Sequence, residues 1–243
     1  MNMQYIRSIR IHWDSISEES YLRRIPALDG LDTLDFHSGL TCLTGENGTG
    51  KSTLLEALAV AFGFNPEGGS QNFLFSTRDT HSELWQAVSL VRGSRRPKDG
   101  FFLRAESFYN VVSQVDEYDD GAGFLNGYGG QSLHAQSHGE SMLALVRNRF
   151  RGDGVYLLDE PETGLSPQRQ LALLIELIRL EQHGSQIILA THSPILLGAP
   201  GAEILSFDDD GIHPTAYEDT ESCRVTKAFV NGRESLLAKL FDT

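Results

Sequence analysis

Cysteine and long apolar runs are scarce in this sequence of 243 residues. Its two cysteines, Cys42 and Cys223, are too few for a disulfide framework, which predicts a reducing compartment such as the cytoplasm. No apolar run has the length of a membrane-spanning helix, and residues 1–7 lack the apolar centre of a signal peptide. These absences argue against a disulfide-stapled secreted domain and against a membrane segment.

Positive charge is also in deficit, with 20 lysines and arginines against 33 aspartates and glutamates and a net charge of −13. Nucleic-acid-binding domains usually carry a basic surplus, so this total argues against a broad nucleic-acid-binding surface while leaving a local basic patch open. No internal repeat is visible. A hydrophobic content of 40% and a charged content of 22% are typical of a globular chain with a substantial core.

A phosphate-binding loop stands out against this background. Residues 40–43 predict an apolar strand, and a helix-forming run that ends near Phe62 follows the loop directly. Between them the sequence matches G-x-x-x-x-G-K-[ST] in the strand–loop–helix context that this motif requires. Glycines let backbone N–H groups point at an anion, and the helix adds the positive end of its dipole, so we expect a bound nucleoside triphosphate. The residues expected to hold it are Gly45, Glu46, Asn47, Gly48, Thr49, Gly50, Lys51, Ser52 and Thr53.

Two side chains of this motif and two later carboxylates have expected chemical roles. Lys51 can reach the β- and γ-phosphates, and the Ser52 hydroxyl can ligate Mg²⁺. Residues 155–158 are continuously apolar, as in a strand of a parallel sheet covered on both faces, and two carboxylates follow directly. Ligands bind at the carboxyl ends of such strands. Asp159 is therefore expected to hold Mg²⁺, and Glu160 to orient or deprotonate the attacking water.

Two further elements gain weight from their positions. A helical run over residues 142–150 begins after Ser137 as a predicted N-cap, with Gly139 allowing a close backbone approach and Glu140 favoured in the first turn. A buried strand over residues 186–190 leads to His192, which would lie beside the site as a contact to the γ-phosphate. Taken singly, the first is an ordinary helix start and the second an ordinary structural histidine.

The remaining pattern predicts a mixed α/β chain. Trp13, Tyr21 and Phe36 are each either core residues or a surface on which adenine could stack. A glycine-rich run at residues 121–130 predicts a surface loop. The other expected elements are strands at 5–13, 34–36 and 101–105, a helix or strand at 82–92, a helix at 168–182, a hairpin at 203–217 and two short helices at about 221–230 and 232–241.

The order of four elements (residues 45–52, 137–140 and 156–160, then His192) resembles that of the ABC-type ATPases. It is most similar to the soluble branch that includes the chromosome-maintenance heads and the double-strand-break-repair ATPases. The resemblance covers nearly the whole chain in layout. It implies an α/β P-loop NTPase of the ABC ATPase head type, with a mainly parallel central sheet flanked by helices and an antiparallel β portion.

This resemblance implies a single domain, residues 1–243. Within it, a helical insert that bears the signature element would cover about residues 64–140, and a hairpin with C-terminal helices would cover residues 203–243. The chromosome and repair proteins carry long coiled-coil arms. About 75 residues separate Phe62 from Ser137 here, without sustained heptads, so the arms are missing. A partner driven by this chain would then dock on its surface, for instance through residues 66–130.

The resemblance also implies a site shared between two chains. In this family two ATP molecules lie between two heads, so that Ser137, Gly139 and Glu140 of one chain would contact in trans the γ-phosphate held by the other. His138 stands where the family usually has glycine. Further correspondences concern residues 164–167, which fall on the dimer-crossing loop, and His192, which falls on the switch histidine. The family also has a glutamine after the strand at 101–105, where this sequence offers only Glu106 and Gln71 as candidates.

The sequence thus predicts a cassette that binds ATP with Mg²⁺, dimerises head to head through the shared site and hydrolyses ATP to drive a change in a partner. Its expected catalytic residues are Glu160, Lys51 and His192, and its expected metal ligands are Ser52 and Asp159. The expected partners are a second copy of the chain and an unidentified protein client.

Three alternatives stay open at this stage. The first is a DNA-associated head in repair or defence, and the second is the energising subunit of a membrane transporter. The third is a nucleotide-gated scaffold with negligible turnover. The basic side chains that DNA would use are Arg92, Arg95, Arg96 and Lys98, or Arg147, Arg149 and Arg151.

Overall fold

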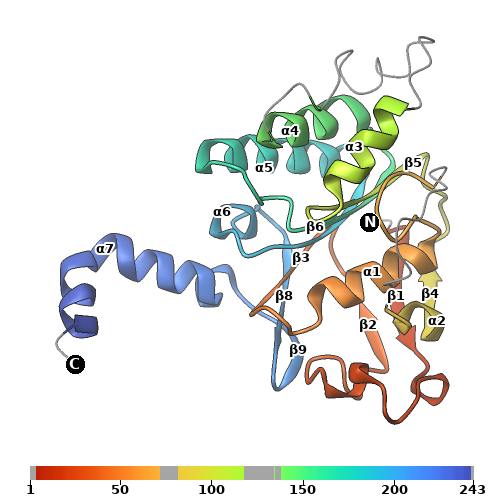
Figure 1. Ribbon diagram of the computed structural model, residues 1–243, viewed down its shortest axis with the longest axis horizontal. Helices are drawn as coiled ribbons and strands as arrows, with labels where there is room; N and C mark the ends of the chain where they lie inside the picture. Colours follow the sequence, from red (N-terminus) through yellow and green to blue (C-terminus); the bar gives the residue numbers. More distant parts are fainter. Residues whose placement is uncertain (1–3, 72–81, 118–133, 135–137, 242–243) are drawn as a thin grey trace.

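The computed structural model describes residues 4–71, 82–117, 134 and 138–241 (Figure 1). Two features expected from the sequence lie outside these residues: the glycine-rich loop at 121–130 and the predicted N-cap residue Ser137. The described residues form two β-sheets, and helices cover both faces of the larger sheet.

The larger sheet has six strands in the order β5-β6-β7-β3-β8-β9. Strands β5, β6, β7, β3 and β8 run parallel, whereas β9 is the antiparallel hairpin partner of β8. Because parallel strands end at the same edge, the residues that follow β3, β6 and β7 come together there. The strands are β3 (Leu40–Gly45), β5 (Asp99–Arg104), β6 (Gly154–Asp159), β7 (Gln186–Ala190), β8 (Glu203–Asp208) and β9 (Gly211–Pro214).

Alternate side chains of the central strands face two separate layers. Tyr156 and Leu158 of β6 belong to a core shared with α4 and α5, whereas Val155 and Leu157 belong to a core shared with α1. Burial of both faces explains why the strands read as continuous apolar runs. The helices of these layers are α1 (Lys51–Phe62), α4 (His138–Arg149) and α5 (Pro167–Gln182). The expected mainly parallel sheet flanked by helices is confirmed.

The smaller sheet is antiparallel, in the order β2-β1-β4, and its core residues join those of α1. Gln186 at the start of β7 links the two sheets. Its Oε1 accepts hydrogen bonds from the backbone N–H groups of Tyr5 (2.9 Å) and Ile6 (2.8 Å), and its Nε2 donates to Ile6 O (2.8 Å). Residues 82–92, expected as helix or strand, contain both. The elements here are β1 (Ile6–Ile11), β2 (Thr33–Asp35), α2 (Leu84–Ala87) and β4 (Val88–Arg92).

The C-terminal hairpin is followed by one helix, α7 (Glu221–Phe241), where the sequence predicted two. Gly232, with φ −140° and ψ 34°, interrupts the helical geometry, so the expected break is present as a kink. The helix extends away from the body of the molecule in Figure 1, and most of its residues are exposed. The short elements are η1 (Trp13–Ser15), η2 (Tyr21–Arg24), α3 (Phe108–Glu117), α6 (Pro194–Leu197) and η5 (Tyr217–Asp219). None of the helices in the described ranges has the length and apolarity to cross a membrane.

Candidate nucleotide-binding and catalytic site

The phosphate-binding loop joins β3 to α1, and two of its glycines occupy positions closed to other residues. Gly45 has φ 139°, and a Cβ there would lie 2.2 Å from the Phe207 carbonyl oxygen. Gly50 has φ 96°, and a Cβ there would lie 2.8 Å from the Ile25 side chain. The loop therefore needs glycine at both positions, for its backbone conformation and for its packing.

The start of α1 presents hydrogen-bond donors toward this loop. The first backbone bond of the helix runs from Leu54 N–H to Gly50 O at 2.9 Å. The N–H groups of residues 51–53 consequently have no acceptor within the helix. Together with the helix dipole, such donors form a site for an anion, and a phosphate suits it.

The Lys51 side chain lies across the same loop. Its Nζ donates hydrogen bonds to the carbonyl oxygens of Gly45 (2.8 Å) and Glu46 (2.6 Å). Burial lowers the pKa of Lys51, and the charges of Glu160 and Asp159 act in the opposite direction. An ammonium group held by neutral carbonyls gains a stronger partner when a phosphate binds, so its geometry suits a triphosphate contact.

Ser52 and Asp159 meet where α1 begins and β6 ends. Ser52 Oγ donates a hydrogen bond of 2.9 Å to Asp159 Oδ1. Asp159 is buried, and this burial raises its pKa to about 6, although the Ser52 hydrogen bond acts against the rise. A hydroxyl and one carboxylate are what Mg²⁺ commonly takes from a protein when phosphates and water complete its ligands. The pair therefore fits Mg²⁺, whose charge would favour the ionised carboxylate.

The metal would depend on the nucleotide for its remaining ligands. Among the described residues, no group of three or more histidine, cysteine, aspartate or glutamate side chains is arranged to hold a metal ion. Oxygens of a bound triphosphate would fill this role.

Glu160 follows β6 in a strained backbone conformation. Its φ of 50° lies in the left-handed region, and its N–H donates to Ala190 O at 2.9 Å. Such strain costs about 1–3 kcal/mol and concentrates at functional sites. The conformation leaves the carboxylate 42% exposed, with Oε1 3.9 Å from His192 Nε2. Glu160 and His192 thus flank one space without a direct hydrogen bond, as a base and a phosphate contact would.

Glu162 has a role that the sequence did not reveal. Its Oε1 accepts hydrogen bonds from Thr191 Oγ1 (2.7 Å) and from the backbone N–H groups of His192 (2.7 Å) and Ser193 (3.1 Å). The carboxylate therefore holds the turn that carries His192 after β7. The only signal in the sequence was a third acidic residue two positions after Glu160, which reads equally well as a solvated loop.

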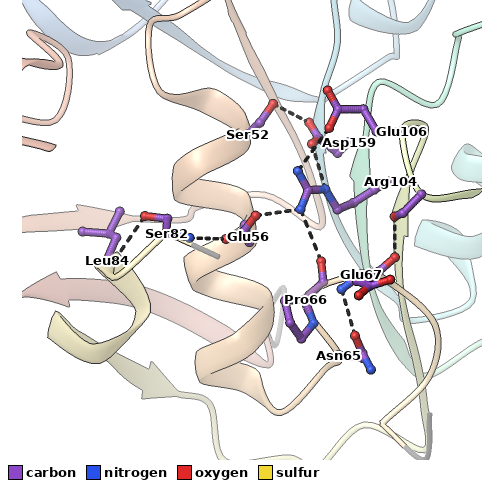
Figure 2. Close-up of polar contacts among 11 residues, drawn as sticks. Ser52, Glu56, Asn65, Pro66, Glu67, Ser82, Leu84, Arg104, Glu106 and Asp159 are labelled. Atoms are coloured by element: carbon purple, nitrogen blue, oxygen red, sulfur yellow. Dashed lines mark hydrogen bonds and ion pairs between the residues drawn. The ribbon is translucent and has the colours of Figure 1, made fainter. Parts of the chain in front are cut away.

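Arg104, at the end of β5, was also missed. Its guanidinium lies between α1 and the end of β6 (Figure 2). Nη1 contacts Glu56 Oε2 at 2.6 Å, and Nε lies 3.8 Å from Asp159 Oδ2. A cation therefore stands beside the carboxylate of the candidate metal site. An arginine that ends a strand has no local pattern to mark it, because its partners are distant in the sequence.

Gln71 and Glu106 are the two candidates for the glutamine that the resemblance implies after β5. Gln71 Nε2 donates to Phe62 O at the end of α1, at 3.2 Å. The Glu106 side chain is 87% exposed and lies 3.5 Å from Arg104 Nη2. In this region the Arg104 guanidinium lies 3.8 Å from the Asp159 carboxylate, and the Ala105 N–H donates to the Asp159 carbonyl oxygen at 3.1 Å.

The start of α4 packs on the loop before α5. Gly139 is buried, and a Cβ there would lie 3.0 Å from Leu165 Cδ2 and from Arg169 Nη1. Glu140 is exposed, and its carboxylate pairs with Arg169 at 2.9 Å. Gly139 and Glu140 are thereby joined to the loop at 164–167 and to the first turn of α5.

The three aromatic residues considered for adenine differ in exposure. Phe36 is buried in the core, which removes it as a stacking surface. Trp13 Nε1 donates to Leu31 O at 3.1 Å, and Arg23 covers its ring. Tyr21 is 51% exposed, and its helix η2 leads directly to Ile25, which touches the phosphate loop.

An open cleft of about 1200 Å³ borders the phosphate loop. Its lining includes Glu160, His192, residues of the β8–β9 hairpin and the first turn of α7. Its position suits a nucleotide whose phosphates lie on the loop.

Two family models match the chain. One, described as "AAA domain", matches residues 21–118, and the other, described as "AAA domain, putative AbiEii toxin, Type IV TA system", matches residues 126–198. The first match includes the phosphate loop. The second includes Asp159, Glu160 and His192.

Relatives with curated descriptions include the ribose import ATP-binding protein RbsA of Yersinia pestis, 26% identical over 189 residues that cover 70% of this chain and 36% of that protein. The macrolide export ATP-binding/permease protein MacB of Marinobacter nauticus is 24% identical over 226 residues, which cover 86% of this chain and 34% of that protein. This chain thus spans about a third of the length of these relatives.

A solved structure gives the fold. The protein cbiO1 from Clostridium perfringens, described as part of the ABC transporter complex cbiONQ, aligns over 99% of this chain and 100% of its own. The TM-score is 0.53 at 16% identity. The chain has the ABC ATPase fold.

Proposed function

We propose that this chain is an ATP hydrolase and acts as a soluble, cytoplasmic switch, which closes as a head-to-head homodimer around two shared ATP sites and opens after hydrolysis. Closure buries the γ-phosphate between the two chains. Hydrolysis removes that phosphate, so the product state favours separation. The cycle drives a conformational change in a protein client that docks on the surface.

Within each site the phosphate loop and Lys51 hold the triphosphate, and Glu160 accepts a proton from a water molecule. The water oxygen bonds to the γ-phosphorus while the bond to the β–γ bridging oxygen breaks, so that ADP and inorganic phosphate form. Bound at Ser52 and Asp159, Mg²⁺ supplies charge neutralisation for the phosphate oxygens. His192 contacts the γ-phosphate, and Glu162 holds the turn that carries His192.

One observation supports the proposed dimer: two segments expected at its interface lie in contact. The resemblance assigned the helix start at 137–140 and the loop at 164–167 to that interface independently. Glu140 pairs with Arg169 at 2.9 Å, and Gly139 packs on Leu165. This contact supports a single continuous surface that a second chain engages.

The test is the mass in solution of the Glu160→Gln variant, measured by sedimentation at several protein concentrations. This variant keeps the phosphate loop but lacks the base, so ATP stays intact. We expect a dimer with Mg-ATP and a monomer with Mg-ADP. A monomer under both conditions would show that the chain does not pair with itself.

Two second-site variants locate the surface. Glu140→Arg, added to Glu160→Gln, places a cation beside Arg169 and is expected to abolish the ATP-dependent dimer. Glu19→Arg makes the same change of charge at an exposed position of the N-terminal loop. It is expected to leave the dimer intact, and equal loss in both variants would contradict the proposed surface.

The energising subunit of a transporter is a second candidate, favoured by what the relatives are named for. RbsA is an import ATP-binding protein, and MacB is an export ATP-binding/permease protein. Purification of the tagged chain from detergent-solubilised cells decides between the two. A stoichiometric membrane protein in the eluate would favour the transporter, whereas recovery with a water-soluble partner would favour the switch.

A DNA-associated head is less well supported, because several members of its basic clusters are paired within the chain. Arg95 and Lys98 both pair with Asp153, at 3.0 and 2.7 Å. Arg147 pairs with Glu176 at 3.1 Å. Binding to duplex DNA that weakens steeply with salt would revive this alternative.

A further inference from the structure

The guanidinium of Arg104 is the centre of a polar network that joins the candidate metal site to three other segments (Figure 2). Nη1 contacts Glu56 Oε2 at 2.6 Å and donates to Pro66 O at 3.3 Å. Nη2 lies 3.5 Å from Glu106 Oε2. The side chain is 18% exposed, so its charge is little screened by water.

One donor of this group has no hydrogen-bond acceptor. Arg104 Nε is buried, and it faces Asp159 Oδ2 at 3.8 Å, too far for a hydrogen bond. The other oxygen of the same carboxylate accepts from Ser52. Asp159 thus has a hydroxyl on one side and an incompletely paired cation on the other.

A cation at this place opposes a second cation at Asp159. A metal ion held by Ser52 and Asp159 would share its carboxylate with the guanidinium and would be repelled by it. Glu56, 8% exposed, holds the guanidinium on the side away from Asp159 and offsets part of its charge. The pair therefore sets how strongly the site favours a divalent ion.

The network also reaches α3. Arg104 donates to the carbonyl oxygen of Pro66, and the next residue is Glu67. The Glu67 carbonyl accepts a hydrogen bond from Ser107, and its carboxylate accepts one from Asn110 at 3.4 Å. Both donors lie at the start of α3. A change in the hold on Arg104 therefore has a direct route to this helix.

We propose that Arg104 is a positioning residue, a tethered cation that opposes the divalent metal at Asp159 and passes the state of the metal site to the start of α3. By linkage, metal binding loosens the hold on Arg104 to the same extent that Arg104 weakens metal binding. This proposal rests on the metal role given to Ser52 and Asp159 under the proposed function.

The test measures the affinity of a fluorescent ADP analogue in saturating Mn²⁺ and in EDTA. The ratio is the affinity in Mn²⁺ divided by the affinity in EDTA. The ratio reports the metal alone, because it cancels effects on folding and on nucleotide contacts. Since ADP is used, hydrolysis and dimerisation do not enter. Arg104→Gln is expected to raise the ratio about ten-fold, because it removes the cation that repels the metal. Glu56→Gln is expected to lower the ratio about three-fold, because it removes the carboxylate that offsets part of the Arg104 charge.

Two further variants control for damage to the fold. Arg104→Gln leaves Glu56 buried without its cation, whereas the double variant Glu56→Gln/Arg104→Gln removes both charges. Its ratio is expected to lie above that of the native chain, because the opposing cation is gone, and it need not equal the product of the two single effects, because the residues are in contact. Arg149 pairs with Asp99 at 2.7 Å at the other end of β5, with similar burial. Arg149→Gln is expected to leave the ratio unchanged.

The second readout is amide hydrogen exchange over residues 104–113. Adding Mn-ADP is expected to change exchange there in the native chain and not in Arg104→Gln. An unchanged or lower ratio in folded Arg104→Gln would overturn the inference, as would a shift of the same sign in Glu56→Gln. If the native chain binds the nucleotide equally with and without Mn²⁺, the metal assignment of the proposed function fails instead.

Discussion

The backbone N–H of His192 donates a hydrogen bond of 2.7 Å to Glu162 Oε1, which ties the turn after β7 to the loop after β6. The same oxygen also accepts from Thr191 and Ser193. One carboxylate therefore fixes His192 relative to Glu160, although neither of these two side chains contacts the other closely. The distance between Glu160, the proposed base, and His192, the proposed phosphate contact, therefore depends on Glu162, which has neither of these roles in the proposed reaction.

Replacing Glu162 by alanine is expected to lower the free energy of unfolding by about 2–4 kcal/mol, because three donors lose a charged acceptor. ATP hydrolysis is expected to fall more than ATP affinity, since the phosphate loop is unaffected. Urea denaturation and single-turnover hydrolysis measure the two effects. Thr163→Ala, at the exposed neighbouring position, is the control. Equal behaviour of the two variants would show that the Glu162 bonds have no role.

Replacing Lys51 by methionine is expected to weaken ATP binding at least about 100-fold while leaving the chain folded. Burial already lowers the pKa of Lys51, so removal of this charge does not cost stability in the nucleotide-free chain. Fluorescence titration with an ATP analogue and urea denaturation test both statements. Lys98→Met removes an exposed lysine and should retain affinity. Strong ATP binding by Lys51→Met would remove the phosphate loop as the site.

Replacing Glu160 by glycine separates strain from chemistry. Glycine adopts the φ of 50° freely, so the variant is expected to be more stable by about 1 kcal/mol, while Glu160→Gln keeps the strain and the stability of the native chain. Both variants lose the base, so hydrolysis falls at least about 100-fold in each. Turnover close to the native rate in Glu160→Gln would mean that another group activates the water.

Cys42 supplies a pH-dependent test of the core. Burial raises the pKa of this thiol from 9.0 to about 12. Because the unfolded chain loses the thiol proton first, the free energy of unfolding is expected to fall as pH rises from about 9 toward 12. This decline should be shallower in Cys42→Ala, measured by urea denaturation at several pH values in a Cys223→Ala background.

The same background allows a labelling test. At pH 8.5 the folded thiol stays protonated and enclosed, so iodoacetamide should react with Cys42 only as fast as the chain unfolds. Rapid labelling of the folded chain would show that the strand before the phosphate loop is accessible.

Several features were readable from the sequence because each depends on neighbours in the chain. The loop at residues 45–52 is a local pattern, and the ends of α1 at Lys51 and Phe62 follow from the glycines beside them. The apolar run before Asp159 predicted a strand buried on both faces, which β6 is. The kink in α7 was anticipated as a break, because glycine marks an interruption whether or not a new helix follows.

By itself, then, the sequence determined the phosphate loop, the order of the strands along the chain and the carboxylates that follow β6, because these are matters of local spacing. Only the tertiary structure decided which distant side chains contact and hold these site residues. Arg104 reaches Glu56 and Asp159, and Glu162 reaches the turn at His192, across 48, 55 and 30 positions of the chain. Such partners are chosen by the order β5-β6-β7-β3 in the sheet, which brings distant strand ends to one edge, and no local pattern encodes that order.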